Sequence, residues 1–588
     1  IVIGGGVGGL TVAHELVERG YTVEVYEARA AWGGKSRSQP VPGSATAGRR
    51  ELPGEHGFRF YPRFYKHVID TMSRIPSGGA SVVERLRATT ESAIALVDRA
   101  TWYRFFRRSV SRPYEIVEAL ELFFQELDFD NRDVGLFAAK ILQFLTSCDE
   151  RRLGEYEHMS WWEYLHGDIY SENFQRQLRA VPRTMVAMDP RRGSARTVGT
   201  VSMQLIMDYA DTGVTNDRTM GGPTSEMWID PWVDYLHTKG VAFHANARCT
   251  NILVGAGQIT GVELDGLGVR TADYYVLAVP IDAAIGLLNP QLAAIDPALA
   301  RLAAANADDL VSWMTGIQYF LYEDVPLVRG HTFYPDSPWA LTTISQPQFW
   351  RDLGLFRTRY GNGEVGGLIS VDISDWDTPG NFINKPAKLC TPDEVAKEVW
   401  SQLKAGLNGH TRDEEVLTDA MLHSWHLDDD LDYSAGSPPR NHSRLLVHPP
   451  GSWNLRPEAA TRVPNLVLAA DYVRTQTDLA SMEGACEAGR RATNAILERS
   501  GYPGARARLW PLTEPAVFAR AKKLDAWFYK HGKRHLFERL GIKNAARGAA
   551  ALYKLEVMLG WAKADEWLDK NFRATKTFRS ILELIGFG

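Results

Sequence analysis

The sequence IVIGGGVGGLTVAHELVERGYTVEVYE, residues 1–27, decides the fold of this chain. Residues 1–3 are apolar and predict a short buried strand that runs directly into a glycine-rich turn. Apolar residues then recur at helical spacing until Gly20, and residues 21–26 alternate like a second strand ending on Glu27. Strand, glycines, helix, strand and terminal acid in this order are typical of a dinucleotide-binding βαβ unit.

The glycines of this turn fit G-x-G-x-x-G with Gly4, Gly6 and Gly9, and Gly8 lies among them. The first makes the tight turn, the second lets the backbone approach a pyrophosphate, and the third allows close helix–strand packing. The helix start adds unpaired N–H groups and the positive end of its dipole. Glu27, 18 residues after Gly9, is suited to hold an adenosine ribose through its hydroxyls. We expect a dinucleotide here, with a structural glycine turn as the alternative.

A second glycine pair, Gly33-Gly34, follows in the loop AAWGGKSRS and lets the backbone approach a ligand closely. Lys35 and Arg37 beside it are suited to offset phosphate charge. A turn carrying two exposed cations is the alternative interpretation.

The stretch GEHGFRFYPRFYKHVIDTM, residues 54–72, interleaves ionisable side chains with Phe and Tyr. Glu55, His56 and Arg59 in this setting suit the wall of an apolar pocket. Glu55 or His56 is the candidate for a side-chain base, although a histidine of this kind is more often a hydrogen-bonded structural residue.

Length and composition favour a soluble globular protein of two or three domains, with 588 residues, 45% of them hydrophobic and 23% charged. The net charge of −5 gives no indication of a nucleic-acid partner. Charge is uneven, because residues 501–588 hold 17 Lys and Arg against 8 Asp and Glu, a net of +9. Such asymmetry predicts that one end of the chain meets an anionic surface.

The four cysteines lie far apart and form no C-x-x-C pair, which favours free thiols in a reducing, cytoplasmic compartment. No apolar run approaches the roughly 18 residues of a spanning helix. The sequence begins inside the first strand without a Met, so a targeting segment upstream would not be visible.

We predict an α/β fold with a discontinuous Rossmann-like nucleotide domain, an inserted α+β substrate domain and a C-terminal helical tail. The expected segments are 1–100, 236–285 and 456–504 for the nucleotide domain, 101–235 (helical) and 286–455 for the substrate domain, and 505–588 for the tail. Within them we predict helices over 117–127, 134–148, 160–166, 197–210 and 394–403, strands over 316–321 and 367–373, and an aromatic, polar loop over 336–350.

The stretch NLVLAADYVRTQTDLASMEGACEAGRRATNAILERS, residues 465–500, predicts a buried strand, a turn at Asp471 and a long helix. That helix is expected to begin near Ser481–Met482 and to carry small residues along one side. An acid directly after a strand, followed by a helix N-terminus, again suits a polar cofactor tail.

Three motifs in order resemble the flavin amine oxidase/phytoene desaturase superfamily, and in particular its plant-type carotenoid desaturases, with hydroxysqualene dehydroxylases as relatives. WGGKSRS is similar to the L-G-G-K motif of that branch, GEHGFRFYPRFY to its E-x-G-x-H segment, and LAADYVRTQTDLASMEGACEAGRRA to its C-terminal motif. The resemblance covers roughly residues 1–500 and leaves the tail from about 505 uncovered. Ala470 departs from the Gly that is usual there.

The resemblance implies FAD and assigns its contacts, and we expect non-covalent binding because no Cys lies beside the predicted ring segment Ala480–Met482. The ADP half would lie at the first glycines, Glu27 and neighbouring Ala28, and the pyrophosphate or ribityl chain at Gly33, Gly34 and Lys35. The remaining implied contacts are His56, Gly57, Phe58 and Arg59 along the isoalloxazine, Cys249 at the adenine through its backbone, Asp471 at the ribityl or phosphate end, and Ala480, Ser481 and Met482 near the flavin ring. No metal is expected.

The expected activity is a desaturation or dehydrogenation of a long apolar substrate by hydride transfer to flavin N5. The resemblance implies polyisoprenoid substrates, such as carotenoid precursors or hydroxysqualene-like alcohols. An amine oxidase is one alternative, although Ser481 stands where that branch usually has an aromatic-cage Tyr. A non-redox flavin isomerase or cyclase and a lipid-binding escort protein of the same fold are the others.

Residues 505–588 place Leu, Trp and Phe at helical spacings with Lys and Arg between them. Apolar stripes flanked by cations suit helices lying in a membrane interface, which would make the protein peripheral to a membrane. A helical subdomain that packs on the body of the protein is the alternative.

Overall fold

The computed structural model describes residues 1–97, 103–106, 129–186, 188–210, 217–408, 415–514 and 518–541. The chain forms two compact units. The first comprises Ile1–Trp102, Asp217–Val447 and Ser452–Pro511, and the second comprises Tyr103–Asn216, His448–Gly451 and Leu512–Gly588. Among the helices of the described ranges, none has the length and apolar character needed to cross a membrane.

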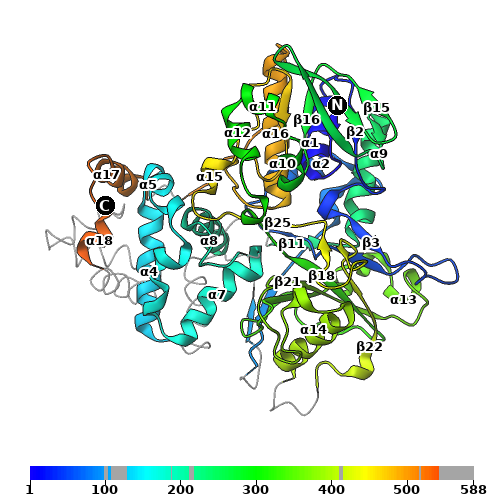
Figure 1. Cartoon of the computed structure of the whole chain (residues 1–588). Helices are drawn as coiled ribbons and strands as arrows, with labels where there is room; N and C mark the ends of the chain where they lie inside the picture. Colours follow the sequence, from blue (N-terminus) through cyan, green and yellow to red (C-terminus); the bar gives the residue numbers. More distant parts are fainter. Residues whose placement is uncertain are drawn as a thin grey trace. The chain divides into compact units, whose positions relative to one another are not determined.

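The first unit contains a parallel five-stranded sheet, whose strands β2 and β16 lie near α1 and α16 in the upper part of Figure 1. Its strands in spatial order are β12 (Ala242–His244), β2 (Glu24–Tyr26), β1 (Val2–Ile3), β16 (Tyr275–Leu277) and β26 (Leu466–Leu468). Both faces of such a sheet are buried at its centre, which explains why β1, β16 and β26 are short apolar runs without polar alternation. The sheet confirms the predicted α/β fold class and the discontinuous origin of its strands.

Helices α1 (Val7–Val17) and α16 (Met482–Arg499) pack against each other beside this sheet. Their close approach depends on small residues, since a Cβ on Gly489 would lie 2.7 Å from the Gly8 carbonyl oxygen. The predicted small side of α16 is buried accordingly, at Gly484, Ala488, Ala492 and Ala495. Helix α9 (Asp230–Thr238) also packs on α1.

A second, larger sheet, here called the mixed sheet, also belongs to the first unit. Its strands in that unit are β9 (Glu91–Ile94), β19 (Gly330–Phe333), β20 (Leu341–Ser345), β21 (Gly367–Ile373), β18 (Thr315–Leu321) and β22 (Leu422–Leu427), in spatial order. Alternate residues of β18 and β21 form an apolar face with helix α14 (Pro392–Leu407). The other face receives strand β4 (Pro53–Glu55), as the contacts of β18 with β4 show.

The predicted loop over 336–350 is wrong in its centre, because residues 341–345 form strand β20 between β19 and β21. Leu-Thr-Thr-Ile-Ser is rich in β-branched residues, which favour a pleated strand. The aromatic residues on either side hid this short run. The strands predicted over 316–321 and 367–373 and the helix over 394–403 are confirmed as β18, β21 and α14.

The second unit is mainly helical in the part that the structure describes, and it also includes strand β10 (Tyr103–Phe106). It contains α4 (Asn131–Thr146), α5 (Asp149–Gly154), α6 (Trp161–Leu165), α7 (Glu172–Val186), α8 (Ala195–Ala210), α17 (Ala519–Lys530) and α18 (Leu536–Leu540). The helices predicted over 134–148, 160–166 and 197–210 are confirmed, whereas the one over 117–127 lies outside the described residues.

Two helices of the predicted tail pack into this second unit. Helix α17 contacts α4 and α5, and its Asp525 is paired with the buried Arg151 at 3.0 Å. One side of α17 is therefore buried, while Trp527 on another side is 47% exposed. The remaining tail, residues 542–588, lies outside the described residues.

Candidate active site

The turn between β1 and α1 is built from glycines that leave no room for side chains. Gly4 has a left-handed backbone with φ of +108°, and a Cβ there would overlap the Ala278 carbonyl. A Cβ on Gly9 would overlap the Gly4 carbonyl, and one on Gly8 would overlap the Ala469 carbonyl. These contacts explain the glycine pattern by close backbone approach, as the sequence predicts.

Gly6 is different, because a Cβ there would make only an ordinary contact and would fit. A Cβ there would meet Gly34 Cα at 3.8 Å as its nearest neighbour. Gly6 is also the N-cap of α1 and provides no side-chain cap, so the first N–H groups of the helix point outward without a capping side chain. An uncapped helix N-terminus of this kind is the surrounding that a phosphate group requires.

Glu27 directly follows β2, and its side chain turns toward the glycine turn. Its carboxylate accepts hydrogen bonds from the Gly5 N–H at 2.8 Å and the Arg29 N–H at 3.0 Å. The Ala247 N–H donates to the Glu27 carbonyl at 2.8 Å, and Cys249 begins strand β13 (Cys249–Gly255) two residues later. The adenine contact predicted for Cys249 thus lies near the ribose contact predicted for Glu27.

The second glycine pair lies against the first. The Gly33 N–H donates to the Gly5 carbonyl at 2.8 Å, and a Cβ on Gly34 would lie 3.1 Å from Gly6 Cα. Both glycines have positive φ, so the loop needs them. The two predicted glycine motifs are therefore parts of one site.

The cations after this pair are held by protein acceptors. The Lys35 ammonium group donates to the Arg444 carbonyl. Arg37 donates to the Gly34 carbonyl at 2.8 Å and pairs with Asp430 at 2.7 Å. Arg37 is predicted to offset phosphate charge, but in the structure the Asp430 carboxylate already neutralises its guanidinium group.

The C-terminal motif lies against the glycine turn after β1, because the Ala469 carbonyl at the end of β26 contacts Gly8. Asp471 follows two residues later and is half-buried. Helix α16 then begins where the sequence predicts, with Ser481 as its N-cap between Ala480 and Met482. The Ser481 hydroxyl accepts from the Gly484 N–H at 3.1 Å.

Tyr65 contacts Ser481 and was not foreseen from the sequence. Its hydroxyl shares a hydrogen bond with the Ser481 side chain, and burial raises the pKa of the phenol. An aromatic side chain thus stands beside the position at which the amine oxidases usually carry a Tyr. No local sequence signal indicates this pairing, because 416 residues separate the two positions.

Glu55 is fixed by the mixed sheet. Gln318 of β18 accepts from the Glu55 N–H at 3.1 Å and donates to the Glu55 carbonyl at 3.0 Å. One carboxylate oxygen, Oε1, accepts from the Ser38 hydroxyl at 2.7 Å and from the Thr224 N–H at 2.8 Å. Burial raises the pKa of Glu55, while Arg59 and these two donors favour its ionised form.

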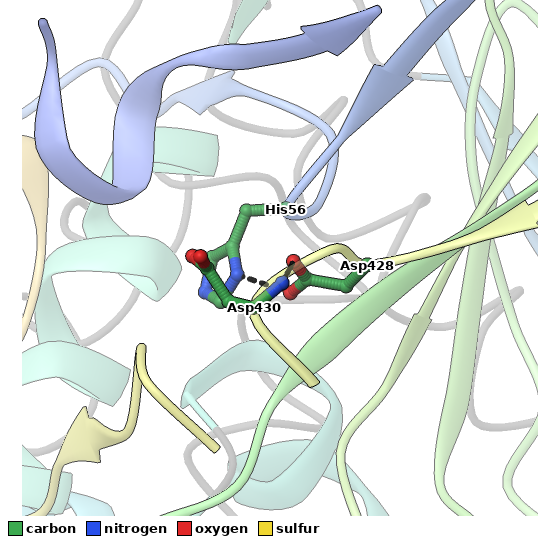
Figure 2. A group of neighbouring side chains, drawn as sticks. All are labelled: His56, Asp428 and Asp430. Atoms are coloured by element: carbon green, nitrogen blue, oxygen red, sulfur yellow. Dashed lines mark hydrogen bonds and ion pairs between the residues drawn. The ribbon is translucent and has the colours of Figure 1, made fainter. Parts of the chain in front are cut away.

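His56 lies beside two aspartates of the segment after β22 (Figure 2). Its Nδ1 is 2.5 Å from Asp428 Oδ2, and Gln39 donates to the other oxygen of that carboxylate at 2.7 Å. Asp430 pairs with Arg37 and with Arg29, which hold the pKa of that carboxyl far below its usual range despite burial.

Histidine and two carboxylates within 4.8 Å of one another are a possible ligand set for a metal ion. Both carboxylates already have partners, since Asp430 is neutralised by two guanidinium groups. An incoming cation would face that positive charge. We interpret this group as an ion-pair network that orients His56.

Asp372 of β21 is the other ionisable residue at this site, and the sequence analysis missed it. The Phe58 N–H donates to its carboxyl group, and burial raises its pKa to about 8, opposed by Arg59. A Cβ on Gly57 would lie 2.6 Å from Asp372 Oδ1. An acid inside the apolar strand LISVDI was the available signal.

Arg59 joins the two halves of the site. One of its terminal nitrogens donates to the Lys35 carbonyl at 2.6 Å and lies 3.8 Å from Glu55 Oε2. The segment Glu55–Arg59 is thereby attached to the second glycine pair on one side and to the mixed sheet on the other. The sequence predictions for 1–37, 54–59 and 465–482 thus fall on one continuous site.

The model of the flavin containing amine oxidoreductase family matches residues 7–497. The chain belongs to this family. It is therefore a flavin-dependent oxidoreductase.

Curated relatives include two carotenoid desaturases and a carotenoid ring synthase. The zeta-carotene desaturase of Synechocystis sp. is 25% identical over 531 residues, which cover 84% of this chain and 96% of the relative. The 15-cis-phytoene desaturase of Synechococcus elongatus is 22% identical, over 85% and 95% of the two chains. The carotenoid phi-ring synthase of Streptomyces griseus is 23% identical, over 89% and 92%.

Solved structures share the fold. The cyclohexylamine oxidase of Brevibacterium oxydans superposes with a TM-score of 0.53 at 16% identity, over 85% of this chain and 98% of the other. A putrescine oxidase bound to putrescine gives 0.54 at 14% identity, over 84% and 98%. These similarities confirm the fold and carry no information on the substrate.

Proposed function

We propose that this protein is an FAD-dependent desaturase or dehydrogenase that oxidises C–H bonds of a long apolar substrate of the isoprenoid or carotenoid type. The observation that carries the proposal is the continuity of the site, in which the dinucleotide turn, the 54–59 segment and the start of α16 meet. The similarity to carotenoid desaturases over more than four-fifths of the chain supports the substrate class.

The residues at the site fit a dinucleotide. The room for an added atom at Gly6 and the uncapped start of α1 suit the pyrophosphate, and the buried Glu27 carboxylate suits a ribose. Asp471 and the start of α16 would hold the opposite end of the cofactor. The chain places no cysteine between Ala480 and Met482, which is why we propose non-covalent binding.

When bound, FAD supplies a two-electron acceptor for oxidation of the substrate. The protein would contribute orientation and the exclusion of water. Phe58 and Phe60 contact the His331 ring at centroid distances of 4.9 and 4.5 Å, which gives the mixed-sheet side of the site an aromatic wall. His56, held by Asp428, and Glu55 are the side chains placed to accept a proton.

Two measurements test this proposal. The first identifies the flavin released from the purified protein, and the second identifies the compounds that reduce it. The purified protein should release FAD into the supernatant after acid precipitation. A C40 polyene such as phytoene should then bleach the flavin absorbance under anaerobic conditions, while benzylamine and putrescine should not. Flavin that pellets with the chain would contradict non-covalent binding, and rapid bleaching by either amine would place the protein among the amine oxidases.

We also propose that the C-terminal tail meets an anionic membrane surface. Lys530, Lys533 and Arg534 are exposed at the end of α17, and Lys533 lies over the exposed Trp527 ring at 4.4 Å from its centroid. Each such cation adds about 1 kcal/mol of attraction to an anionic leaflet. An exposed Trp among cations suits the interface.

Liposome sedimentation tests whether the tail binds an anionic membrane surface. The triple variant Lys530→Glu, Lys533→Glu and Arg534→Glu should lose most of its pelleting with phosphatidylserine vesicles at low salt. Lys385→Glu together with Lys388→Glu, which changes surface cations of the first unit, is the control and should pellet like the unchanged protein. Equal pelleting of all three proteins would mean that the tail is ordinary packing.

A further inference from the structure

One face of helix α7 carries a group of arginines that the surrounding acids neutralise only in part. Arg176, Arg179 and Arg183 follow one another at spacings of three and four residues, which places them on the same face of the helix. The loop after the helix adds Arg191. We call these four residues the arginine cluster. They belong to the second unit, and none of them lies in a segment predicted to bind the flavin.

The loop that carries Arg191 is fixed against helix α6. The Trp162 N–H donates to the Pro190 carbonyl at 2.9 Å, so the residue before Arg191 is tied to the start of that helix. The guanidinium carbon of Arg191 lies over the Trp162 ring at 4.7 Å from its centroid, and that of Arg179 lies 6.0 Å from the same centroid. The helix and the loop therefore bring two guanidinium groups to one aromatic ring.

The Trp162 ring is a rigid platform for these two cations. It is 5% exposed, a Cβ on Gly167 would lie 2.2 Å from it, and its N–H donates to the Asp168 carboxylate at 3.1 Å. An arginine that lies over an aromatic ring is held in place, while its N–H donors remain at the edge of the guanidinium plane. Arg179 and Arg191 are therefore oriented before a ligand binds.

The nearby carboxylates leave the charge of Arg179 and Arg191 in excess. Asp189 accepts from a terminal nitrogen of Arg183 at 2.8 Å through one oxygen and from the Arg191 backbone N–H at 2.9 Å through the other. Within the described ranges, no carboxylate forms an ion pair with the guanidinium group of Arg179 or Arg191. Burial lowers the pKa of Arg179, the other three arginines of the cluster lower it further, and Glu172 opposes them. This excess of positive charge favours the binding of an anion.

We propose that the arginine cluster binds a phosphate group that carries two or more negative charges, such as a diphosphate or a phosphate monoester. A carboxylate offers two oxygens and one charge, which suit a single guanidinium group. A phosphate monoester presents three oxygens and up to two charges, so it can accept from several guanidinium groups at once. The proposal assigns to the second unit a ligand site that does not depend on the proposed oxidation.

Calorimetric titration of the flavin-loaded protein with inorganic diphosphate at low salt tests this site. The double variant Arg179→Gln and Arg191→Gln should bind at least about tenfold more weakly, because it removes two sets of charged donors. The double variant Arg179→Lys and Arg191→Lys keeps the charge but loses the planar fork, and its affinity should lie between the two. Arg132→Gln is the control, since that side chain of the same unit is 59% exposed, and it should bind like the unchanged protein.

Vesicles distinguish a lipid headgroup from a free phosphate compound. A lipid ligand predicts tighter binding to vesicles of phosphatidic acid than of phosphatidylserine, and the double glutamine variant should lose this preference. Diphosphate binding without such a preference would identify a free phosphate compound as the ligand.

Two outcomes would overturn the proposal. One is that the unchanged protein binds neither diphosphate nor phosphatidic acid vesicles, and the other is that the glutamine variant binds them equally well. The single variant Arg191→Gln, at an exposed side chain, repeats the test if the double variant folds poorly. Flavin release and flavin bleaching are measured separately, so the proposed function stands or fails independently of this site.

Discussion

The nucleotide turn and the mixed-sheet side of the active site are built in opposite ways. At the turn, glycines bring backbone against backbone, and the charged groups Glu27 and Arg37 are fully paired. Beside the mixed sheet, large polar side chains from distant strands meet, and several of their atoms have no hydrogen-bond partner within the described part of the chain.

This difference distinguishes residues that maintain the fold from residues that are available to bind a ligand. Gly4, Gly8 and Gly9 leave no room for an added atom, so this part of the turn is rigid, whereas the first N–H groups of α1 have no capping side chain and suit a phosphate. The region of Glu55, Arg59 and Asp372 leaves hydrogen-bonding capacity open in a buried place. Unsatisfied groups of this kind are retained where a ligand completes them.

The largest effect is expected for Gly9→Val in the turn. The new side chain would collide with the Gly4 carbonyl, which is backbone and cannot move aside. We expect a loss of about 3 kcal/mol or more in the free energy of unfolding, measured by urea denaturation, together with loss of the flavin. Gly286→Ala in α10 (Ile281–Leu287), where a Cβ meets nothing within 4 Å, should instead change stability by less than about 1 kcal/mol. Similar losses of stability for Gly9→Val and Gly286→Ala would contradict the rigidity of the glycine turn.

The substitution Asp372→Asn tests the mixed-sheet side of the active site through the pH dependence of the free energy of unfolding. Because burial raises the pKa of Asp372 from 3.8 to about 8, the folded protein keeps a proton there that the unfolded chain loses above pH 4. Folded stability should therefore fall as pH rises from about 4 to 8, by up to about 1.4 kcal/mol per pH unit. Arg59 opposes the shift and Asp428 adds to it.

The asparagine variant has no such proton, so its stability relative to the unchanged protein should increase between pH 5 and pH 8. Urea denaturation at the two pH values measures this difference. Asp377→Asn, whose carboxylate is exposed, should show the same relative stability at both. If the stability difference between Asp372→Asn and the unchanged protein were the same at both pH values, this carboxyl would be ionised throughout the range.

Glu27→Ala and Asp471→Ala should each weaken FAD binding by about 1–3 kcal/mol. Each removes an acceptor for cofactor hydroxyls, and the first also leaves the Gly5 and Arg29 N–H groups without their partner. Titration of the flavin-free protein with FAD gives the affinity. Glu323→Ala, at an exposed glutamate, should bind FAD normally. Normal affinity in both test variants would mean that the cofactor lies elsewhere.

The smallest effect concerns the start of α16. Ser481→Ala removes the N-cap hydroxyl that accepts from Gly484, and such caps contribute about 1 kcal/mol. Thermal unfolding should show a modest decrease in midpoint. Ser481→Thr keeps the hydroxyl and should behave like the unchanged protein. A large loss of FAD affinity in the alanine variant would instead indicate a direct contact between this hydroxyl and the flavin.

The nucleotide half could be predicted from sequence because its determinants are local. The glycines, the length of the first helix and the acid after the second strand all fall within residues 1–27. The start of α16 at Ser481–Met482 was likewise set by a local cap. Local backbone requirements leave a pattern in the sequence, and a pattern can be recognised.

The mixed-sheet half could not be predicted in this way. Gln318 and Asp372 reach Glu55 and Gly57 across more than 250 residues, and no spacing rule connects them. Strand β20 was missed because flanking aromatic residues concealed a five-residue run. The pairing of Tyr65 with Ser481 also depends on tertiary packing alone.

The spatial order of the parallel sheet has a consequence for how the chain folds. Strand β1 lies between β2 and β16, and β26, which completes the sheet, comes from residues 466–468. During synthesis the flavin site therefore stays incomplete until most of the described chain has left the ribosome. Such distant pairings form slowly and expose apolar edges meanwhile. Cofactor supply should accordingly raise the yield of folded protein by capturing each chain once the last strand is in place.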